Sequence, residues 1–211
     1  MAMTVQTNMN TMGVLRNIQN SETQANKQLE ALSSGYKINS AADDPAGFAI
    51  SLRLEGSKQK YVAAQENVLS ATALTKTADA GLNRINDIVK DLQSLATRAA
   101  SGQNSSSELN NLNDLAKNLL QNVDQIANGT QFNGQPLLNS NAAPTIQIGQ
   151  SGAATDQLAI NLSDNTAQAL GISGIDLSTQ AGAQAALNSL DQAAATLTNN
   201  QASLGASNNE L

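Results

Sequence analysis

An unbroken seam of apolar and small residues runs through the first half of the chain and limits its possible folds more than any other feature. Spacings of four and three residues alternate over seven heptads, at Ile50, Leu54, Ser57, Tyr61, Ala64, Val68, Ala71, Thr75, Ala78, Leu82, Ile85, Val89, Leu92, Ala96 and Ala99. This alternation is typical of a helix that packs along its length against other helices. Flanking apolar residues at Leu74, Ile88 and Leu95 broaden the seam and indicate more than one neighbour.

The seam predicts one helix over about residues 45–101, which at 1.5 Å per residue would be about 80 Å long. Asp44 suits the N-cap, Pro45 suits the first helical position, and Gly102 suits a left-handed residue after the last turn. Asp43 and Asp44 could instead form a paired-carboxylate site for a metal or for acid–base chemistry. With no His, no further acids nearby and no Gly-rich loop, we favour the capping interpretation.

A first helix is predicted over about residues 5–34. Leu15, Ile18, Glu22, Ala25, Leu29, Leu32 and Tyr36 repeat the three-four spacing, and Gly35 follows as a stop. The segment 1–14 is apolar but has no strong register. Because a helix alone in water frays, this one needs a partner.

Three further elements follow. Ser105 and Glu108 offer a capping box for a helix over about residues 105–127, which a short turn would place antiparallel to the second helix. Alternating residues predict a β-hairpin within about 144–163. A last helix, about 181–211, carries leucines at intervals of seven. It reads as a bundle helix rather than a leucine zipper, because no Lys or Arg follows Lys117 to supply a basic region.

The residue types exclude most catalytic chemistry. The 211 residues include no Cys, His or Trp, so thiol nucleophiles, imidazole bases and ordinary zinc sites are not available. The four aromatic residues, Tyr36, Phe48, Tyr61 and Phe132, line pockets poorly. We therefore expect neither an enzyme nor a cofactor or metal site.

The charges also argue against several partners. All eleven basic residues lie between Arg16 and Lys117 and alternate with acids there, whereas residues 118–211 carry six acids and no base. A nucleic-acid interface needs clustered Lys and Arg, so nucleic acid is not an expected partner. No run of about 20 apolar residues predicts a membrane span, and the first ten residues do not read as a signal peptide, so export would need another route.

Several strings closely resemble bacterial flagellins. Residues 32–51, LSSGYKINSAADDPAGFAIS, resemble the N-terminal pattern LSSG-x-x-IN-x-A-x-DD-x-AG-x-AI of that family. The strings TADAGLNRI at 77–85, VDQIANGTQFNG at 123–134 and ASLGA at 202–206 are similar to later flagellin segments in the same order. The resemblance covers nearly the whole chain.

The resemblance implies a mainly α fold, with long antiparallel helices in a rod-like coiled-coil bundle and a small β-hairpin. It implies that residues 1–40 form the helix of the filament inner tube and are disordered in the monomer, and that residues 41–211 form the core domain. The function implied is that of a secreted, extracellular subunit of the flagellar filament. The implied partners are other flagellin subunits, the flagellar type III export machinery, the filament cap and hook-associated proteins.

The resemblance also assigns the residues that would carry this function. The residues assigned to packing in the inner tube are Leu15, Ile18, Leu29 and Leu32. The residues assigned to packing in the core are Leu82, Ile85, Leu92, Leu119 and Ile126. The connection between the first two helices falls to Asp44, Pro45 and Gly47. A region that would contact the Toll-like receptor for flagellin is formed by Lys90, Asp91, Ser94, Leu95 and Arg98. Strongly recognised flagellins carry Arg and Glu where Asp91 and Ser94 stand, so we expect weak receptor activation.

Two alternatives stay open at this point: a hook–filament junction protein, which shares the LSSG and DDP elements, and an intracellular coiled-coil scaffold. The strings at residues 46–50 and 132–134 fit flagellin better, and a scaffold would not explain them. Flagellins with an inserted metalloprotease domain need HExxH, which a chain with no His cannot supply. Family members continue beyond the motif at 202–211, so this chain is either a fragment that stops within its last helix or a naturally short flagellin-like protein. In either case we expect it to polymerise poorly alone, because its first helix lacks a partner.

Overall fold

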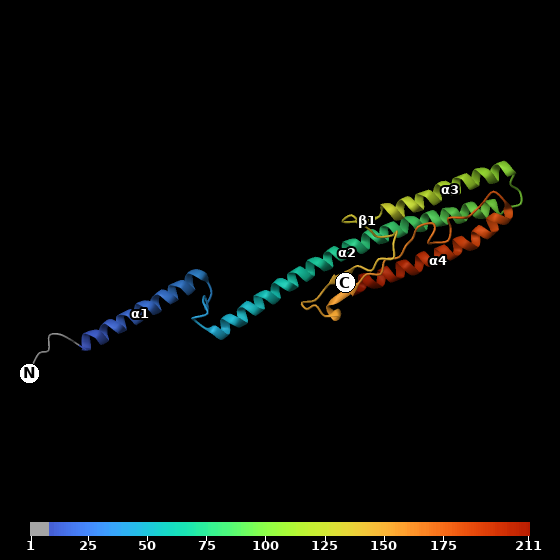
Figure 1. Ribbon diagram of the computed structural model, residues 1–211. Helices are drawn as coiled ribbons and strands as arrows, with labels where there is room; N and C mark the ends of the chain where they lie inside the picture. Colours follow the sequence, from blue (N-terminus) through green and yellow to red (C-terminus); the bar gives the residue numbers. More distant parts are fainter. Residues whose placement is uncertain (1–8) are drawn as a thin grey trace, which may run out of the picture. The chain divides into compact units, whose positions relative to one another are not determined.

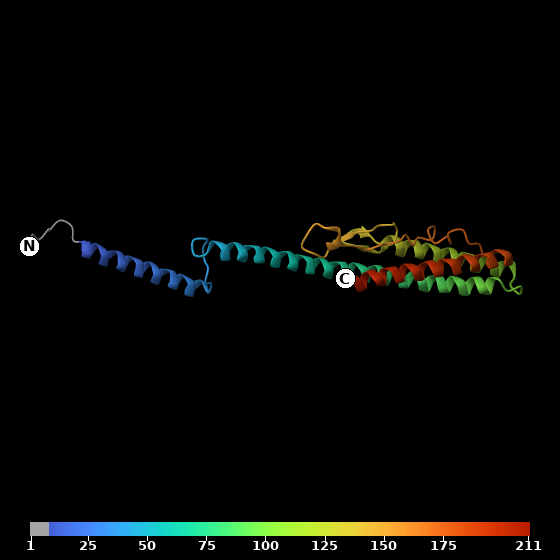
Figure 2. The same cartoon turned by 90° about the horizontal axis from the view of Figure 1, so that it is seen from below.

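The computed structural model describes residues 9–211 and divides the chain into two compact units, one ending at Gln59 and one spanning Lys60–Leu211. The helices of the described part are α1 (Met9–Ser34), α2 (Pro45–Ala99), α3 (Ser106–Gly129) and α4 (Gln180–Glu210). In the second unit, α3 and α4 lie along the C-terminal part of α2 (Figures 1 and 2). This mainly helical fold with small two-stranded sheets confirms the predicted fold class.

α1 ends where the sequence places a glycine. Gly35 has a φ of 75°, a left-handed conformation that glycine adopts without strain, and its N–H donates to the Ala31 carbonyl over 3.0 Å. The predicted start of this helix at residue 5 lies outside the described residues. No residue of α1 is buried.

α2 begins with a side-chain cap. The Asp44 Oδ1 atom accepts hydrogen bonds from the backbone N–H groups of Ala46, at 3.1 Å, and Gly47, at 3.0 Å. These bonds satisfy donors that the first turn of a helix leaves without partners, and Pro45 has no N–H to satisfy. A Cβ atom at Gly47 would collide with the Asp44 carboxylate and would lie 2.7 Å from the Ile38 Cδ1 atom, so a larger residue here would displace the side chain that caps α2.

The core of the second unit lies between α2, α3 and α4. Ile85, Leu92, Val123, Leu190 and Leu197 are all fully buried there. α4 runs antiparallel to α2, because its first residue bonds to Ala100, the residue that follows α2, and its last turn bonds to Thr75 near the middle of α2. The Gln180 Nε2 atom donates to the Ala100 carbonyl over 3.0 Å, and the Thr75 Oγ1 atom donates to the Asn208 Oδ1 atom over 3.1 Å.

α3 and α4 both begin with capped N-termini. The Ser105 Oγ atom accepts from the Glu108 N–H, and the Glu108 carboxylate accepts from the Ser105 N–H at 2.8 Å, which completes a capping box. The Thr179 Oγ1 atom accepts from the Gly182 N–H at 3.0 Å. Each cap satisfies N–H groups that would otherwise be exposed at the helix start.

The strands form two separate hairpins. β3 (Thr145–Gln147) pairs antiparallel with β4 (Gln157–Ala159) inside the range predicted for a hairpin, and the 3-10 turn Ala154–Asp156 immediately precedes β4. β1 (Gln131–Phe132) and β2 (Gln135–Pro136) form a second pair that our sequence analysis missed. Its turn residues Asn133 and Gly134 have φ of 50° and 77°, as a two-residue turn of type I′ requires.

Polar side chains attach the segment 137–178, which consists of loops and the β3–β4 hairpin, to the helices. The Asn113 Oδ1 atom of α3 accepts from the Leu177 N–H at 3.0 Å, and the Asp124 Oδ1 atom accepts from the Ala167 N–H at 2.8 Å. The buried Asn165 accepts from the Asn200 Nδ2 atom of α4 at 2.8 Å. The first two bonds satisfy backbone N–H groups that have no partner in a strand or helix, and the third joins two side chains, so the loops of this segment can cover the bundle.

Candidate assembly surface

The apolar side chains of α1 lie in solvent. Leu15, Ile18, Leu29 and Leu32, which we call the α1 stripe, are 53, 50, 62 and 81% exposed. A helix without tertiary packing gains little stability from propensity alone, and contiguous exposed apolar surface marks an interaction site. The α1 stripe is therefore the first part of a candidate assembly surface.

α2 carries one seam with two different environments. Its early members Ile50, Leu54 and Tyr61 are 57, 65 and 62% exposed, whereas Ala78 and Leu82 further along are buried. The three-four spacing does not change between them. The early seam thus presents the same packing geometry as the buried seam, but without helices against it, and forms the second part of the candidate surface.

The connection between α1 and α2 is tied together by polar side chains. The Asp43 carboxylate accepts from the Ser40 N–H and Oγ atoms at 3.1 and 2.9 Å and forms a 3.1 Å ion pair with the Lys27 Nζ atom. The hydrogen bond from the Ser40 side chain, then that from Lys27, lowers the pKa of Asp43 below its ordinary value. The Ser34 Oγ atom donates to the Asn39 Oδ1 atom over 2.8 Å.

The residues assigned to core packing and to receptor contact lie on the packed half of the molecule. Leu82, Ile85 and Leu92 are buried, and Leu119 and Ile126 pack against the core while partly buried. In the assigned receptor region, Asp91, Ser94 and Arg98 are exposed and the Lys90 Nζ atom forms a 3.0 Å ion pair with Asp87. Leu95 is only 7% exposed and belongs to the core.

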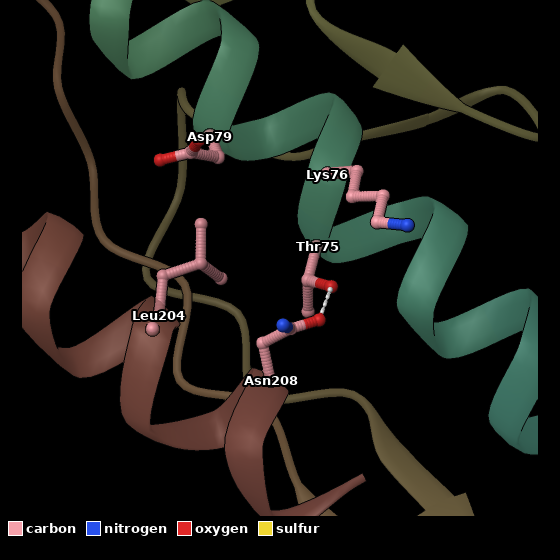
Figure 3. A pocket seen from close by; sticks show the side chains of 6 residues that line it. Thr75, Lys76, Asp79, Leu204 and Asn208 are labelled. Carbon is pink, nitrogen blue, oxygen red and sulfur yellow. Dashed lines mark hydrogen bonds between the residues drawn. The ribbon is translucent and has the colours of Figure 1, made fainter.

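A small hollow lies between α2 and the end of α4 (Figure 3). It has a volume of about 190 Å³, and its lining includes Thr75, Lys76, Asp79, Leu204 and Asn208. The Thr75–Asn208 hydrogen bond crosses it, so a polar contact joins the two helices at a buried position of the α2 seam. The hollow is small for a ligand site, since ligand pockets usually measure about 300 Å³ or more.

The described residues offer no other obvious chemistry. Among residues 9–211, no three His, Cys, Asp or Glu side chains come together to hold a metal ion. None of the helices in this part of the chain is both long enough and apolar enough to cross a membrane. The exposed seam is thus the most prominent functional feature.

Known proteins similar to this chain include flagellins. The family model "Bacterial flagellin N-terminal helical region" matches residues 5–143. A flagellin of Serratia marcescens is 34% identical over 181 residues, which are 85% of this chain and 51% of that protein. The chain therefore spans about half the length of this relative.

Solved structures share the fold. The crystal structure of Bacillus cereus flagellin matches with a TM-score of 0.62 and 29% identity, covering 69% of this chain and 84% of that one. A putative flagellar hook-associated protein from Vibrio parahaemolyticus matches with a TM-score of 0.66, covering 81% of this chain and 90% of that one. At 15% identity, the second likeness shows the fold alone.

A helical bundle whose heptad seam continues into exposed apolar helix belongs to the class of helix-packing structural proteins. The family match covers well over half of the chain. The chain belongs to the bacterial flagellin family.

Proposed function

We propose that this protein is a structural subunit of the bacterial flagellar filament and acts without catalysis. The observation that carries the proposal is the α1 stripe, whose four side chains are each at least half exposed. Exposed apolar surface of this extent is costly in water and is removed when a second helix packs on it. Membership of the flagellin family supports the same role.

In this proposal the two parts of the chain have different tasks. Residues 1–40 form the inner tube of the filament, where a partner covers α1, which has no buried residue in the free chain, and residues 41–211 form the core domain. The burial of Leu82, Ile85 and Leu92 and the exposure of Leu15 and Leu29 support this division. Asp44, Pro45 and Gly47 form the connection between α1 and α2.

The proposed partners follow from the family. Other subunits of the same kind would cover the exposed seam, and the type III export machinery, the filament cap and hook-associated proteins would contact the chain during export and assembly. The proposed location is the extracellular flagellum.

Weak recognition by the Toll-like receptor for flagellin is a second part of the proposal. Asp91 and Ser94 are exposed and place an anion and a neutral side chain where strongly recognised flagellins carry Arg and Glu. A misplaced charge at an interface lowers affinity when it loses water. A receptor reporter assay should show low potency, and full potency at low protein concentration would contradict this.

The central test is binding of a partner helix. Far-ultraviolet circular dichroism and analytical ultracentrifugation would be recorded on the purified chain, before and after adding a peptide that carries a flagellin C-terminal helix. We expect a gain of helix or assembly on addition. A chain that is already fully helical and indifferent to the peptide would contradict the proposed function.

Matched variants locate the response. Leu29→Asp places a charge in the α1 stripe and should abolish the response to the peptide. Leu115→Asp makes the same change at a 47% exposed leucine of α3, outside the stripe, and should leave the response intact. Equal responses of the two variants would show that the stripe is not the binding surface.

A further inference from the structure

A second surface of the packed unit carries two basic side chains that form no ion pair in the described part of the chain. Two adjoining hollows, of about 440 and 430 Å³, lie between α2 and the end of α3 and share Arg84, Gly129 and Thr130 in their lining. We call them together the Arg84 groove. Lys76 lines one end, and Gln125 lines the other. The residues that line the groove include two cations and no carboxylate.

In the described part of the chain, neither cation of the groove is within ion-pair distance of an acid. Among residues 9–211, the ion pairs are Lys27–Asp43, Lys90–Asp87 and Lys117–Asp114, so neither Arg84 nor Lys76 takes part in one. No hydrogen bond from either side chain is present in the described part. A guanidinium presents five donors in a planar fork that matches a carboxylate, so Arg84 is equipped for such a partner.

The groove is shaped for close approach. A Cβ atom at Gly81 would lie 2.6 Å from the Leu138 Cδ1 atom and 2.8 Å from the Thr130 Oγ1 atom, so glycine at this position lets the end of α3 pack directly against α2. A Cβ atom at Gly129 would meet nothing within 4 Å, which leaves the surface above it open. The groove is therefore open beside Gly129, which lines it together with Arg84.

The matching charge is present in the same chain. Residues 118–211 have six acids and no base: Asp124, Asp156, Asp164, Asp176, Asp191 and Glu210. The second unit thus combines a groove whose charged lining residues are Lys76 and Arg84 with six acids that no base accompanies in the second half of the chain. Complementary charges of this kind guide the encounter of two surfaces and set their register.

We propose that the Arg84 groove receives carboxylates from residues 118–211 of a second copy of this chain. The groove residues and the acids are different residues, so one contact does not have to use both sets on each copy. A heterologous contact of this kind leaves a free groove and free acids at its two ends. Such a contact can repeat from copy to copy. The inference rests on the proposed function for its biological setting and adds to it a polar, salt-sensitive contact distinct from the apolar α1 stripe.

A simpler role for Arg84 would be local. The residue lies beside the C-terminal end of α3, where a cation interacts favourably with the helix dipole. That role would change the stability of the unit when Arg84 is replaced, but it would not join two molecules. The test therefore needs an intermolecular readout.

Carbodiimide cross-linking supplies that readout, because it joins an amine to a carboxylate in direct contact. Equal amounts of unlabelled and nitrogen-15-labelled full chain would be mixed, so that mass spectrometry identifies links between copies. Lys76 supplies one amine in the groove, and the variant Arg84→Lys supplies a second while keeping the charge. We expect both amines to be joined to acids within residues 118–211 of the other copy.

Salt and charge reversal sharpen the result. The links should form at about 0.01 M salt and be lost at about 1 M, where the Debye length falls from about 30 Å to about 3 Å. Arg84→Glu should lower the yield of the Lys76 links roughly tenfold, as expected when a like charge replaces an opposite one. Arg98→Glu makes the same change at an exposed arginine of α2 outside the groove and should preserve the yield.

Several results would overturn the inference. Links from the groove to acids before residue 118 would do so, as would links within one copy only, or an unchanged Lys76 yield in Arg84→Glu. Circular dichroism confirms folding of each variant, and Arg84→Gln replaces Arg84→Glu if the latter unfolds. If sedimentation shows association that Arg84→Glu leaves unchanged, the groove is not the contact, and the proposed function is unaffected. If no association occurs at either salt concentration, the groove contact is also refuted. The proposed function is tested separately by the response to the C-terminal peptide, and a failed response would refute it.

Discussion

The two ends of α2 present the same sequence pattern in opposite environments. Near its C-terminal end, Ile85, Val89 and Leu92 are fully buried against α3 and α4. Near its start, Ile50 and Leu54 occupy equivalent seam positions and are 57 and 65% exposed. α2 is one unbroken helix between these two regions. A heptad seam therefore indicates that a helix is suited to packing, and says nothing about whether its partner lies in the same molecule.

The difference has an energetic meaning. Burial of a large apolar side chain stabilises the folded state by about 1.5–3 kcal/mol, and an exposed one contributes almost nothing until a partner arrives. The buried end of α2 holds the unit together. The apolar side chains of the exposed end can stabilise only an associated state, in which a partner buries them.

The largest expected effect compares Leu92 with Leu54. Leu92→Ala removes a fully buried side chain and should lower the free energy of unfolding of the packed unit by about 2–5 kcal/mol. Leu54→Ala makes the same chemical change at an exposed seam position and should alter it by less than about 0.5 kcal/mol. Urea unfolding followed by circular dichroism measures both. Equal losses would mean that the start of α2 is packed in the free protein.

Glycines on the same helix provide a second comparison. Gly81→Ala would force a Cβ atom against Leu138 and Thr130 and should destabilise the packed unit by about 1–3 kcal/mol. At Gly56, an added Cβ atom meets nothing within 4 Å. Gly56→Ala should therefore raise local helix stability by roughly 0.5–1 kcal/mol, because alanine loses less entropy in a helix. Thermal unfolding and helix content by circular dichroism would separate the two, and a stabilising Gly81→Ala would show that α3 can move away from α2 freely.

Sequence analysis succeeds where a signal is local. The cap at Asp44, the stop at Gly35 and the capping box at Ser105 each depend on residues within a few positions, and the structure forms all three. The predicted hairpin within 144–163 likewise depends on alternation that a short window reveals. The β1–β2 hairpin had an equally local signal in Asn133-Gly134, and it was missed because its strands are only two residues long.

The features that sequence analysis did not foresee depend on distant pairs. Asn113 and Asp124 bond to backbone groups 64 and 43 positions away, and Asn165 bonds to Asn200. Nothing local distinguishes these side chains from the other polar residues of their helices. The Arg84 groove is a similar case, because it exists only after α3 has folded back along α2.

Helix caps test whether the two regions unfold together. Ser105→Ala removes the cap of α3 within the packed unit and should lower its free energy of unfolding by about 1 kcal/mol. Asp44→Ala removes the cap at the exposed start of α2. It should reduce local helix content and leave the unfolding midpoint of the packed unit unchanged. A shift of that midpoint by Asp44→Ala would show that the two regions unfold as one cooperative body.

The smallest expected effect is a change in the unfolding midpoint as the pH is lowered. Hydrogen bonds from the Ser105 N–H and hydroxyl lower the pKa of Glu108, and hydrogen bonds from Ser40, then Lys27, lower that of Asp43. A carboxylate with a lowered folded-state pKa adds stability above its unfolded pKa, about 4, and loses it as the pH falls through the folded value. The unfolding midpoint of the wild-type unit should thus exceed that of Glu108→Gln at pH 7, and the gap should close below about pH 4. Asp43→Asn should leave this midpoint unchanged at every pH, because Asp43 lies in the unpacked region. A constant gap for Glu108→Gln would assign its effect to geometry rather than to charge.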